Sequence, residues 1–441
     1  MSVLSPTSPG PSLGTRVVNL LRRRLVQNVL TLSGVDFVMY ALPLVTVPYL
    51  VRVLGVDAWG TLAFYQSFAI ILSQVIEFGF KWSGTRDVAQ NRKEPAELSK
   101  ILAGVLGGKA ILVIVGVVAA ILLASMVPAL GRSSLLLSLA LLWASGLGLN
   151  VIWFYHGLER MRLAAGLTAS SKLIATIGVF VLVRSPEDAW KVLLLYAGAA
   201  WIASLMGLLL IHRSIPFQRP TFALGIATLR PAVTFFIFNS AVSFYTIANV
   251  FILGLFASPR IVGYYAGAEK ISKALLMLLT PVSRALYPRV SYLAQSARER
   301  AADLVRLEMK ILVAGAVAMS AGAIFFAPLI VRIILGGEFG RSVPIVQLGA
   351  LLPLIIVPNL VLGTHWMISL GLERPYLKIV LAAGVLNFSL AILMAPRYGA
   401  IGMMLAVVIT EVFVTTTVVT WLWRRHMDPF RYVTRLTEQG A

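Results

Sequence analysis

Residues 101–127 read ILAGVLGGKAILVIVGVVAAILLASMV, an apolar run with a single charged residue, Lys109. About 20 apolar residues in a row are enough to cross the hydrocarbon core of a bilayer as a helix. A helix satisfies its backbone hydrogen bonds within one segment, so it is the form in which such a run can cross lipid. This stretch therefore predicts a transmembrane helix, and similar runs recur along the chain.

The composition agrees with a membrane protein. Of the 441 residues, 59% are hydrophobic and 13% are charged, whereas a soluble domain has about 45–50% apolar and about 25% charged residues. The mean hydropathy is +0.87. These values exclude a secreted disulfide scaffold, a disordered chain and an ordinary cytosolic enzyme. The chain has no cysteine and only four histidines, so we expect neither a disulfide framework nor a bound metal.

The apolar runs predict twelve transmembrane helices. Of the 38 lysines and arginines, 25 fall in loops on one side of these spans and 8 on the other. Cytoplasmic loops are rich in basic residues, so we expect both termini in the cytoplasm and no role for the net charge of +20 in binding nucleic acid. The expected spans are 27–51, 59–80, 101–127, 134–156, 163–183, 190–211, 232–256, 262–287, 308–334, 343–369, 376–395 and 399–423.

Two short sequences occur in both halves of the chain, in the same order. Gly-Arg-Ser stands at 131–133 and 340–342, and Gly-Leu-Glu-Arg at 157–160 and 371–374. Six spans per half give both halves the same orientation, as in parallel-repeat transporters. We expect an all-α integral membrane protein of two six-helix bundles, related by a pseudo-two-fold axis along the membrane normal. The expected segments are a cytoplasmic tail at 1–18, bundles at 19–215 and 228–425, a cytoplasmic linker at 216–227 and a second cytoplasmic tail at 426–441.

Several charged residues lie inside the expected spans. A charge at the bilayer centre costs at least about 2.5–3.5 kcal/mol, so it usually has a function; snorkelling to the interface is the alternative. On 262–287, Glu269, Lys273 and Arg284 share a helical face with Thr280, and Glu269 can pair with Lys273. Unpaired cations outnumber anions in the spans, which favours an anionic cargo. The candidate substrate-binding residues are Lys273, Arg284, Lys172, Lys109, Lys270 and Arg52, with the polar residues Asn239, Ser243 and Thr246.

Embedded acids are the candidates for ion coupling. A carboxylate inside a span can carry H+, bind Na+ or pair with a lysine. The four candidates are Asp36, Glu411, Glu269 and Glu77. We expect no cofactor other than such a coupling ion.

The chain shows no motif for enzymatic chemistry. The string closest to a phosphate-binding loop, 104–110, is one residue short and lies within a span. Gly104 and Gly108 instead fit a small-xxx-small face for helix packing. No catalytic triad, zinc-protease motif or acid pair stands outside the spans, so we expect a carrier rather than an enzyme.

An ordered set of strings from Asn19 to Arg425 resembles the Wzx-type polysaccharide (O-antigen) flippases of the multidrug/oligosaccharidyl-lipid/polysaccharide exporter superfamily. His156 departs from that pattern, since family members often carry Gln there. The strings that carry the resemblance are Pro48-Tyr49-Leu50-x-Arg52-Val53-Leu54-Gly55, Glu77-Phe78-Gly79-Phe80, Trp153-Phe154-Tyr155-His156-Gly157-Leu158-Glu159-Arg160-Met161, Gly263-Tyr264-Tyr265 with Ala268-Glu269-Lys270-Ile271, Tyr287-Pro288-Arg289, and Gly399-Ala400-Ile401-Gly402 with Thr410-Glu411.

The resemblance implies a monomeric flippase in the bacterial inner membrane. It would move an undecaprenyl-pyrophosphate-linked oligosaccharide from the cytoplasmic to the periplasmic leaflet by alternating access, driven by an ion gradient, with a polysaccharide polymerase as a candidate partner. A lipid II-type flippase and a cation-coupled multidrug extruder of the same superfamily are the alternatives. The extruder would suit acid-rich, cation-poor spans, and the five basic residues embedded in the expected spans speak against it. A membrane glycosyltransferase or polymerase would need a large outer loop, and none is expected here.

Overall fold

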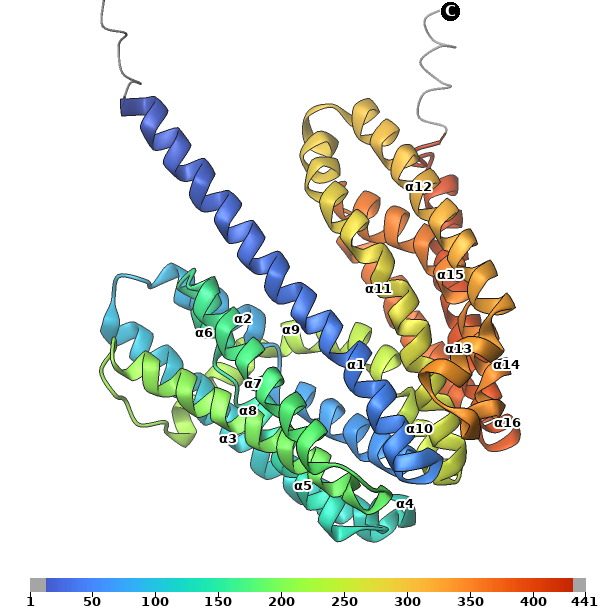
Figure 1. Cartoon of the computed structure of the whole chain (residues 1–441). Helices are drawn as coiled ribbons and strands as arrows, with labels where there is room; N and C mark the ends of the chain where they lie inside the picture. Colours follow the sequence, from blue (N-terminus) through green and yellow to red (C-terminus); the bar gives the residue numbers. More distant parts are fainter. Residues whose placement is uncertain (1–12, 431–441) are drawn as a thin grey trace, which may run out of the picture.

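The structure is a computed structural model, which describes residues 13–430, and their side chains except those of residues 13–41, 238–244, 282 and 284. In this part of the chain all the regular secondary structure is helical (Figure 1). The first and the last helix both bend at a glycine: α1 (Leu13–Glu77) at Gly55, with φ of 70°, and α16 (Glu373–Arg424) at Gly399, with φ of 55°. Glycine adopts such positive φ values without steric cost, so each long helix makes two passes, as the expected spans require.

The helices between α1 and α16 follow the expected spans. Among the described residues, eight helices are long and apolar enough to cross a membrane. Two of them bend at Gly55 and Gly399, and α9–α10 and α11 occupy the two remaining expected spans. The elements are α2 (Phe80–Gln90), α3 (Pro95–Met126), α4 (Pro128–Gly131), α5 (Ser134–Gly148), α6 (Ile152–Gly157), α7 (Met161–Leu182), η1 (Pro186–Asp188), α8 (Ala189–His212), α9 (Phe222–Ile247), α10 (Asn249–Phe256), α11 (Pro259–Ser296), α12 (Arg298–Phe325), α13 (Ala327–Ile334), η2 (Gly337–Ser342), α14 (Val343–Gly349), α15 (Leu352–Asn359) and the π-helical η3 (Leu360–Met367).

Some boundaries differ from the expected ones. The span at 134–156 is interrupted between α5 and α6, where the Asn150 side chain accepts a hydrogen bond from the Ile152 N–H at 2.7 Å. The span at 343–369 is divided into α14, α15 and η3. Helix α1 already begins within the expected tail 1–18, and α9 begins within the expected linker 216–227. Helix termini prefer residues that supply a capping group, and hydropathy does not report these.

The sequence repeat corresponds to a repeated contact. In the first half the Ser133 N–H donates to the Tyr65 hydroxyl at 3.1 Å; in the second half the Ser342 hydroxyl donates to the Tyr264 carbonyl at 3.0 Å. Each Gly-Arg-Ser turn is thereby fixed to the second helix of its own half. The same element therefore occupies the same place in both bundles, in agreement with the expected parallel duplication.

The main core shared by the two bundles lies at one end. The largest apolar cluster joins α1 around Leu54 to α11 around Tyr265. A second cluster, around Val305 and Trp366, belongs to the second bundle. A third, around Phe80 and Phe154, belongs to the first bundle apart from residues of the crossing helix α9, such as Ala232. The bundles accordingly converge at the end where α4 and α10 lie and diverge toward the end where α1 begins and α16 finishes (Figure 1).

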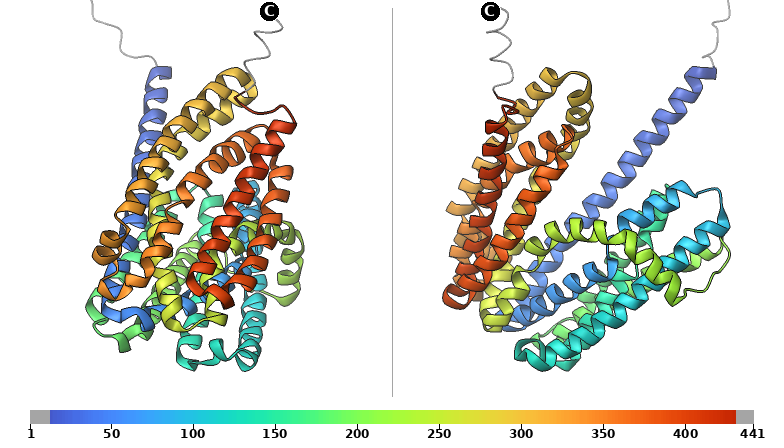
Figure 2. Two further views of the ribbon diagram at one scale, coloured as in Figure 1. Left: turned by 90° about the vertical axis from the view of Figure 1, so that its right-hand side faces the viewer. Right: turned by 180° about the vertical axis from the view of Figure 1, so that it is seen from behind.

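Helix α9 connects the two bundles. Figure 2 shows it crossing from the first bundle to the second. Its first half packs on α3, where the Thr228 hydroxyl donates to the Gly104 carbonyl at 2.9 Å. A Cβ at Gly108 would meet the Gly225 carbonyl oxygen at 3.3 Å. The predicted packing role of Gly104 and Gly108 is confirmed.

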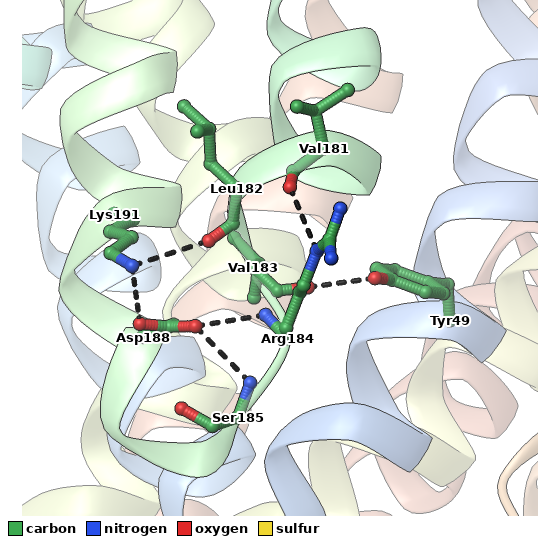
Figure 3. Close-up of polar contacts among 8 residues, drawn as sticks. All are labelled: Tyr49, Val181, Leu182, Val183, Arg184, Ser185, Asp188 and Lys191. Carbon is green, nitrogen blue, oxygen red and sulfur yellow. Dashed lines mark hydrogen bonds and ion pairs between the residues drawn. The ribbon is translucent and has the colours of Figure 1, made fainter.

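A polar turn closes the converging end of the first bundle between α7 and α8 (Figure 3). The Asp188 carboxylate accepts from the N–H groups of Arg184 at 2.9 Å and Ser185 at 3.2 Å, and pairs with the Lys191 ammonium at 2.6 Å. The Tyr49 hydroxyl donates to the Val183 carbonyl at 2.7 Å, which fixes the end of α7 to α1. Tyr49 belongs to the string that carries the family resemblance, and this contact gives it a structural role.

Candidate functional site

A polar cavity of about 350 Å³ lies within the first bundle. It contains two lysines and one carboxylate, so its charged side chains carry a net positive charge. Four elements contribute to it: α1, α2, α3 and the interrupted helix α5–α6. The lining residues are Gln74, Glu77, Lys81, Lys109, Leu147, Asn150, Ile152, Trp153 and His156.

Lys109 is the most deeply placed cation of this cavity. Its side chain is fully buried, and its ammonium donates to the Asn150 carbonyl at 3.0 Å. That carbonyl lies at the break between α5 and α6. Glu77 also lines the cavity and accepts a hydrogen bond from the Lys81 N–H at 2.5 Å; no ion pair joins it to Lys109 among the described contacts. The Lys109 ammonium therefore keeps donor capacity for a ligand.

A second basic group lies on α11. The Lys273 ammonium pairs with the Glu269 carboxylate at 3.0 Å and donates to the Thr246 carbonyl of α9 at 3.4 Å. The predicted pair between Glu269 and Lys273 is confirmed. The Lys273 side chain is 43% exposed and that of Glu269 only 9%. Lys270 is half-buried on the same helix. A ligand could reach Lys273, but it would compete with Glu269 for the ammonium.

The other predicted site residues are dispersed. Lys172 is exposed on α7, and Glu411 is buried on the second half of α16 with Tyr245 and Tyr376 as electrostatic neighbours. The structure thus does not gather the sequence-derived candidates into one cluster, and their roles stay predictions. The side chains of four candidates lie outside the described part of the structure: Asp36 on α1, Asn239 and Ser243 on α9, and Arg284 on α11.

Arg52 lies at the junction of the bundles instead of in a cavity. Its guanidinium donates to the Ile333 carbonyl at the end of α13. Nearby, the Arg260 guanidinium of α11 pairs with the Asp57 carboxylate of α1 at 3.2 Å. Both contacts join one bundle to the other across the converging end.

Two glycines allow the helices to meet closely at this junction. A Cβ on Gly60 would overlap the Pro259 carbonyl oxygen, and a Cβ on Gly263 would overlap the Val56 carbonyl oxygen. Close approach of two backbones requires such small residues. We use the term junction for this contact region between the bundles. It consists of the polar contacts of Arg52 and Asp57 and of the close packing at Gly60 and Gly263.

Sequence reasoning missed four polar residues of the cavity: Gln74, Lys81, Asn150 and His156. Gln74 and Glu77 are three residues apart on α1, which is one helical face. Lys81 directly follows the expected span 59–80, and Asn150 lies within the expected span 134–156. The neutral amides within an apolar run were the signal that could have shown this site, because such groups also require partners in lipid.

Comparison with known proteins identifies the family. The sequence profile described as "Polysaccharide biosynthesis protein" matches residues 25–294. The match covers more than half of the chain, so this protein belongs to the polysaccharide biosynthesis protein family, whose curated relatives here are transporters and not enzymes.

Two curated relatives have the name "Putative O-antigen transporter". The one from Shigella dysenteriae is 28% identical over 400 residues, which is 88% of this chain and 97% of the relative. The one from Escherichia coli (strain K12) is 26% identical over 401 residues, which is 90% of this chain and 97% of the relative.

Solved structures share the fold. The inward closed conformation of the lipid II flippase MurJ superposes with a TM-score of 0.71 at 13% identity, covering 89% of this chain and 87% of MurJ. An inward-facing multidrug resistance MATE transporter of the MOP superfamily gives a TM-score of 0.61 at 14% identity, covering 89% and 96%. The two-bundle architecture expected from the repeat is therefore that of MOP transporters.

Proposed function

We propose that this protein flips an undecaprenyl-pyrophosphate-linked oligosaccharide from the cytoplasmic to the periplasmic leaflet of the bacterial inner membrane, for surface polysaccharide synthesis. The single observation that carries the proposal is the cavity of the first bundle, with Lys109 and Lys81 opposed by Glu77 alone. Ammonium groups in a site with little water attract phosphate oxygens strongly. The names of the curated relatives support the same class of cargo.

The junction supports alternating access. The bundles share a core at the converging end and, apart from the crossing helix α9, have separate cores at the other. With the termini in the cytoplasm, as the basic loops predict, the described conformation is closed toward the periplasm. Transport then requires the contacts of Arg52 and Asp57 to break while contacts form at the cytoplasmic end.

The energy source belongs to the proposal as well. An embedded acid that changes its protonation or ion occupancy would favour one conformation over the other. Asp36, Glu411, Glu269 and Glu77 are the candidates named from the sequence, with H+ or Na+ as the ion. We take Asp36 as the first to test: Asp36→Asn keeps the size of the side chain but removes its titration.

The test is complementation in a bacterial strain that lacks its own O-antigen flippase. Export of surface polysaccharide is measured on gels of extracted glycan, and protein abundance by blot. The proposal predicts export by the parent protein and at least a tenfold loss in Lys109→Met at equal abundance. A parent protein that is abundant in the membrane but exports no lipid-linked glycan, in strains offering several different glycans, would contradict the proposal.

A lipid II-type flippase is the second candidate, favoured by the superposition on MurJ. Both cargoes contain a pyrophosphate on a polyprenol, so the cationic cavity suits either. Rescue of a strain depleted of its lipid II flippase, without rescue of O-antigen export, would favour this candidate.

A further inference from the structure

A buried polar chain of three side chains joins three elements of the second bundle. The Glu308 carboxylate oxygen Oε1 of α12 lies 2.7 Å from Nδ1 of His365 in η3. On the other side of the ring, Nε2 of His365 lies 3.1 Å from the Ser283 hydroxyl of α11. The exposed fractions are 0% for Glu308, 4% for His365 and 5% for Ser283. None of the three residues was a candidate from the sequence.

Glu308 and His365 lie within ion-pair distance of each other. None of the three atoms Oε1 and Oε2 of Glu308 and Nδ1 of His365 has a hydrogen-bond partner of suitable geometry among the described residues. A buried carboxylate that is not neutralised by its surroundings is costly. A proton bound by the imidazole or by the carboxylate compensates that negative charge.

Ser283 allows both protonation states. When the ring is neutral with its proton on Nδ1, the Ser283 hydroxyl donates to Nε2 of His365. When the ring is protonated, Nε2 donates to the Ser283 oxygen instead. The hydroxyl can rotate between these roles without moving the helix far, so the site can gain and lose one proton while it stays hydrogen-bonded.

Among the described side chains, no other charged group forms an ion pair with Glu308 or His365. On α11, the Tyr287 ring packs on His365 with centroids 4.9 Å apart, and the Arg284 side chain lies outside the described part. On α12, the Arg306 guanidinium points away to the Pro429 carbonyl at 2.8 Å and to Asp303. On α16, the Tyr376 hydroxyl bonds to Thr364. Helices α14 and α15 bring no titratable side chain.

The position of Ser283 links this site to the rest of α11. Pro281 and Pro288 flank it, and a proline within a helix removes one backbone hydrogen bond and weakens the helix there. Further along the same helix, Lys273 pairs with Glu269. The π-helical turn that carries His365 is a form of helix that occurs often at functional sites. A change in the bond between Ser283 and His365 therefore acts on a part of α11 that two prolines weaken.

We propose that Glu308, His365 and Ser283 form a proton-binding site whose occupancy sets the conformation of α11, and thereby couples H+ to movement of the two bundles. This inference rests on the proposed transport function and names its coupling ion. It adds a site in the second bundle to the acids named from the sequence. The chemistry is proton binding only: one proton enters the pair and one leaves, and no covalent bond forms or breaks.

The test measures conformation and needs no cargo. The chain has no cysteine, so Lys93→Cys and Arg300→Cys introduce two unique sites for spin labels, one on each bundle near the ends with separate cores. Both side chains are exposed. Distances between the labels are measured by pulsed electron paramagnetic resonance in nanodiscs, at about pH 5 and about pH 8, values that bracket histidine titration. The proposal predicts a shift in the distance distribution between the two pH values for the labelled parent.

Single substitutions test whether the pH-dependent shift depends on Glu308 and His365. Glu308→Gln keeps the size and hydrogen bonding of the side chain but cannot titrate, so the pH-dependent shift should be lost; His365→Gln should lose it too. Glu299→Gln, on the exposed start of the same helix, is the matched control and should keep the shift. Thermal unfolding and gel filtration confirm folding of each variant.

Three results would overturn the inference: no shift in the labelled parent, an unchanged shift in both Glu308→Gln and His365→Gln, or an equal loss in Glu299→Gln. Because the distances are measured without cargo, these outcomes do not depend on the proposed substrate. A failure of the proposed function would appear instead as absent export in the complementation assay, with the pH-dependent shift intact.

Discussion

The Lys109 ammonium donates a hydrogen bond to the Asn150 carbonyl, 3.0 Å away, at the point where α5 gives way to α6. A broken helix leaves carbonyl groups without their usual partners, and in lipid each requires one. Lys109 supplies such a partner and brings a positive charge into the cavity that Glu77 also lines. The interruption of the span thus provides the carbonyl that the buried Lys109 ammonium binds, and Lys109 provides the donor that this carbonyl needs.

The charge of Lys109 should be required for transport. Lys109→Met keeps most of the apolar stem and removes the charge. A charged hydrogen bond to a ligand contributes about 1.5–3 kcal/mol, so we expect export to fall by about tenfold or more. The measurement is surface polysaccharide in the complementation strain, normalised to protein abundance.

The control for this variant is Lys100→Met on the same helix. Lys100 is exposed and pairs with Glu97 at 3.7 Å. A surface pair of this kind contributes about 0–1 kcal/mol, so export should stay near the parent level. Equal losses in both variants would mean that Lys109 acts through the general charge of the helix and not at the cavity.

Lys273 should tolerate arginine but not glutamine. Its side chain is 43% exposed, which leaves room for a guanidinium that also binds phosphate. We expect partial export from Lys273→Arg and loss from Lys273→Gln. Glu269→Gln removes the competing carboxylate, and binding of a soluble pyrophosphate to the purified protein, measured by calorimetry, should become tighter. Full export by Lys273→Gln would end the assignment of this residue to cargo binding.

A methyl group at Gly60 should prevent the junction from closing. The added Cβ would overlap the Pro259 carbonyl oxygen, so Gly60→Ala should favour the conformation in which the bundles separate there. A cysteine placed at Val262, which is 1% exposed, reports the opening through its rate of maleimide labelling. We expect faster labelling and reduced export.

Gly198→Ala is the control for Gly60→Ala. A Cβ at Gly198 would meet no atom within 4 Å, and alanine is the better helix former. Labelling at Val262→Cys should therefore equal that of the parent. If Gly60→Ala behaves like Gly198→Ala, the junction does not depend on close backbone approach.

The topology inferred from the basic loops is testable with single cysteines. A maleimide that cannot cross the membrane should label Arg132→Cys in intact spheroplasts and should label Lys93→Cys only after lysis. Arg132 and Lys93 are both exposed, so reagent access and not burial decides the result. The reverse pattern would invert the assignment of the termini and with it the direction of closure.

Hydropathy predicted most of the architecture because every span must present about 20 consecutive, mostly apolar residues to the lipid. The run around Lys109 became α3, the bend at Gly55 falls between two expected spans, and the bend at Gly399 falls on the first residue of the last expected span. The pair between Glu269 and Lys273 was predictable because residues four apart on a helix are neighbours. The interruption at Asn150 was not, since it depends on a hydrogen bond between the Asn150 side chain and the Ile152 N–H and on a lysine from another helix.

The proton site was hidden from the sequence for a different reason. Glu308 is the first residue of the expected span 308–334, where an acid needs no explanation, and His365 is one of four scattered histidines. Only the packing of α11, α12 and η3 brings Ser283, His365 and Glu308 together. Residues so far apart in sequence have no shared periodicity, although a histidine within an apolar span was a signal in itself.

The most direct test of the account is flipping by the purified protein in proteoliposomes. The cargo is a fluorescent oligosaccharide linked to undecaprenyl pyrophosphate, and the readout is protection of the dye from a reductant that cannot cross the membrane. The account predicts loss of protection over time with the parent protein, at least tenfold slower loss with Lys109→Met, and no flipping of the same oligosaccharide on uncharged undecaprenol. Equal flipping of the charged and uncharged lipids by the parent, or equal rates for the parent and Lys109→Met, would contradict recognition of the pyrophosphate by the cationic cavity.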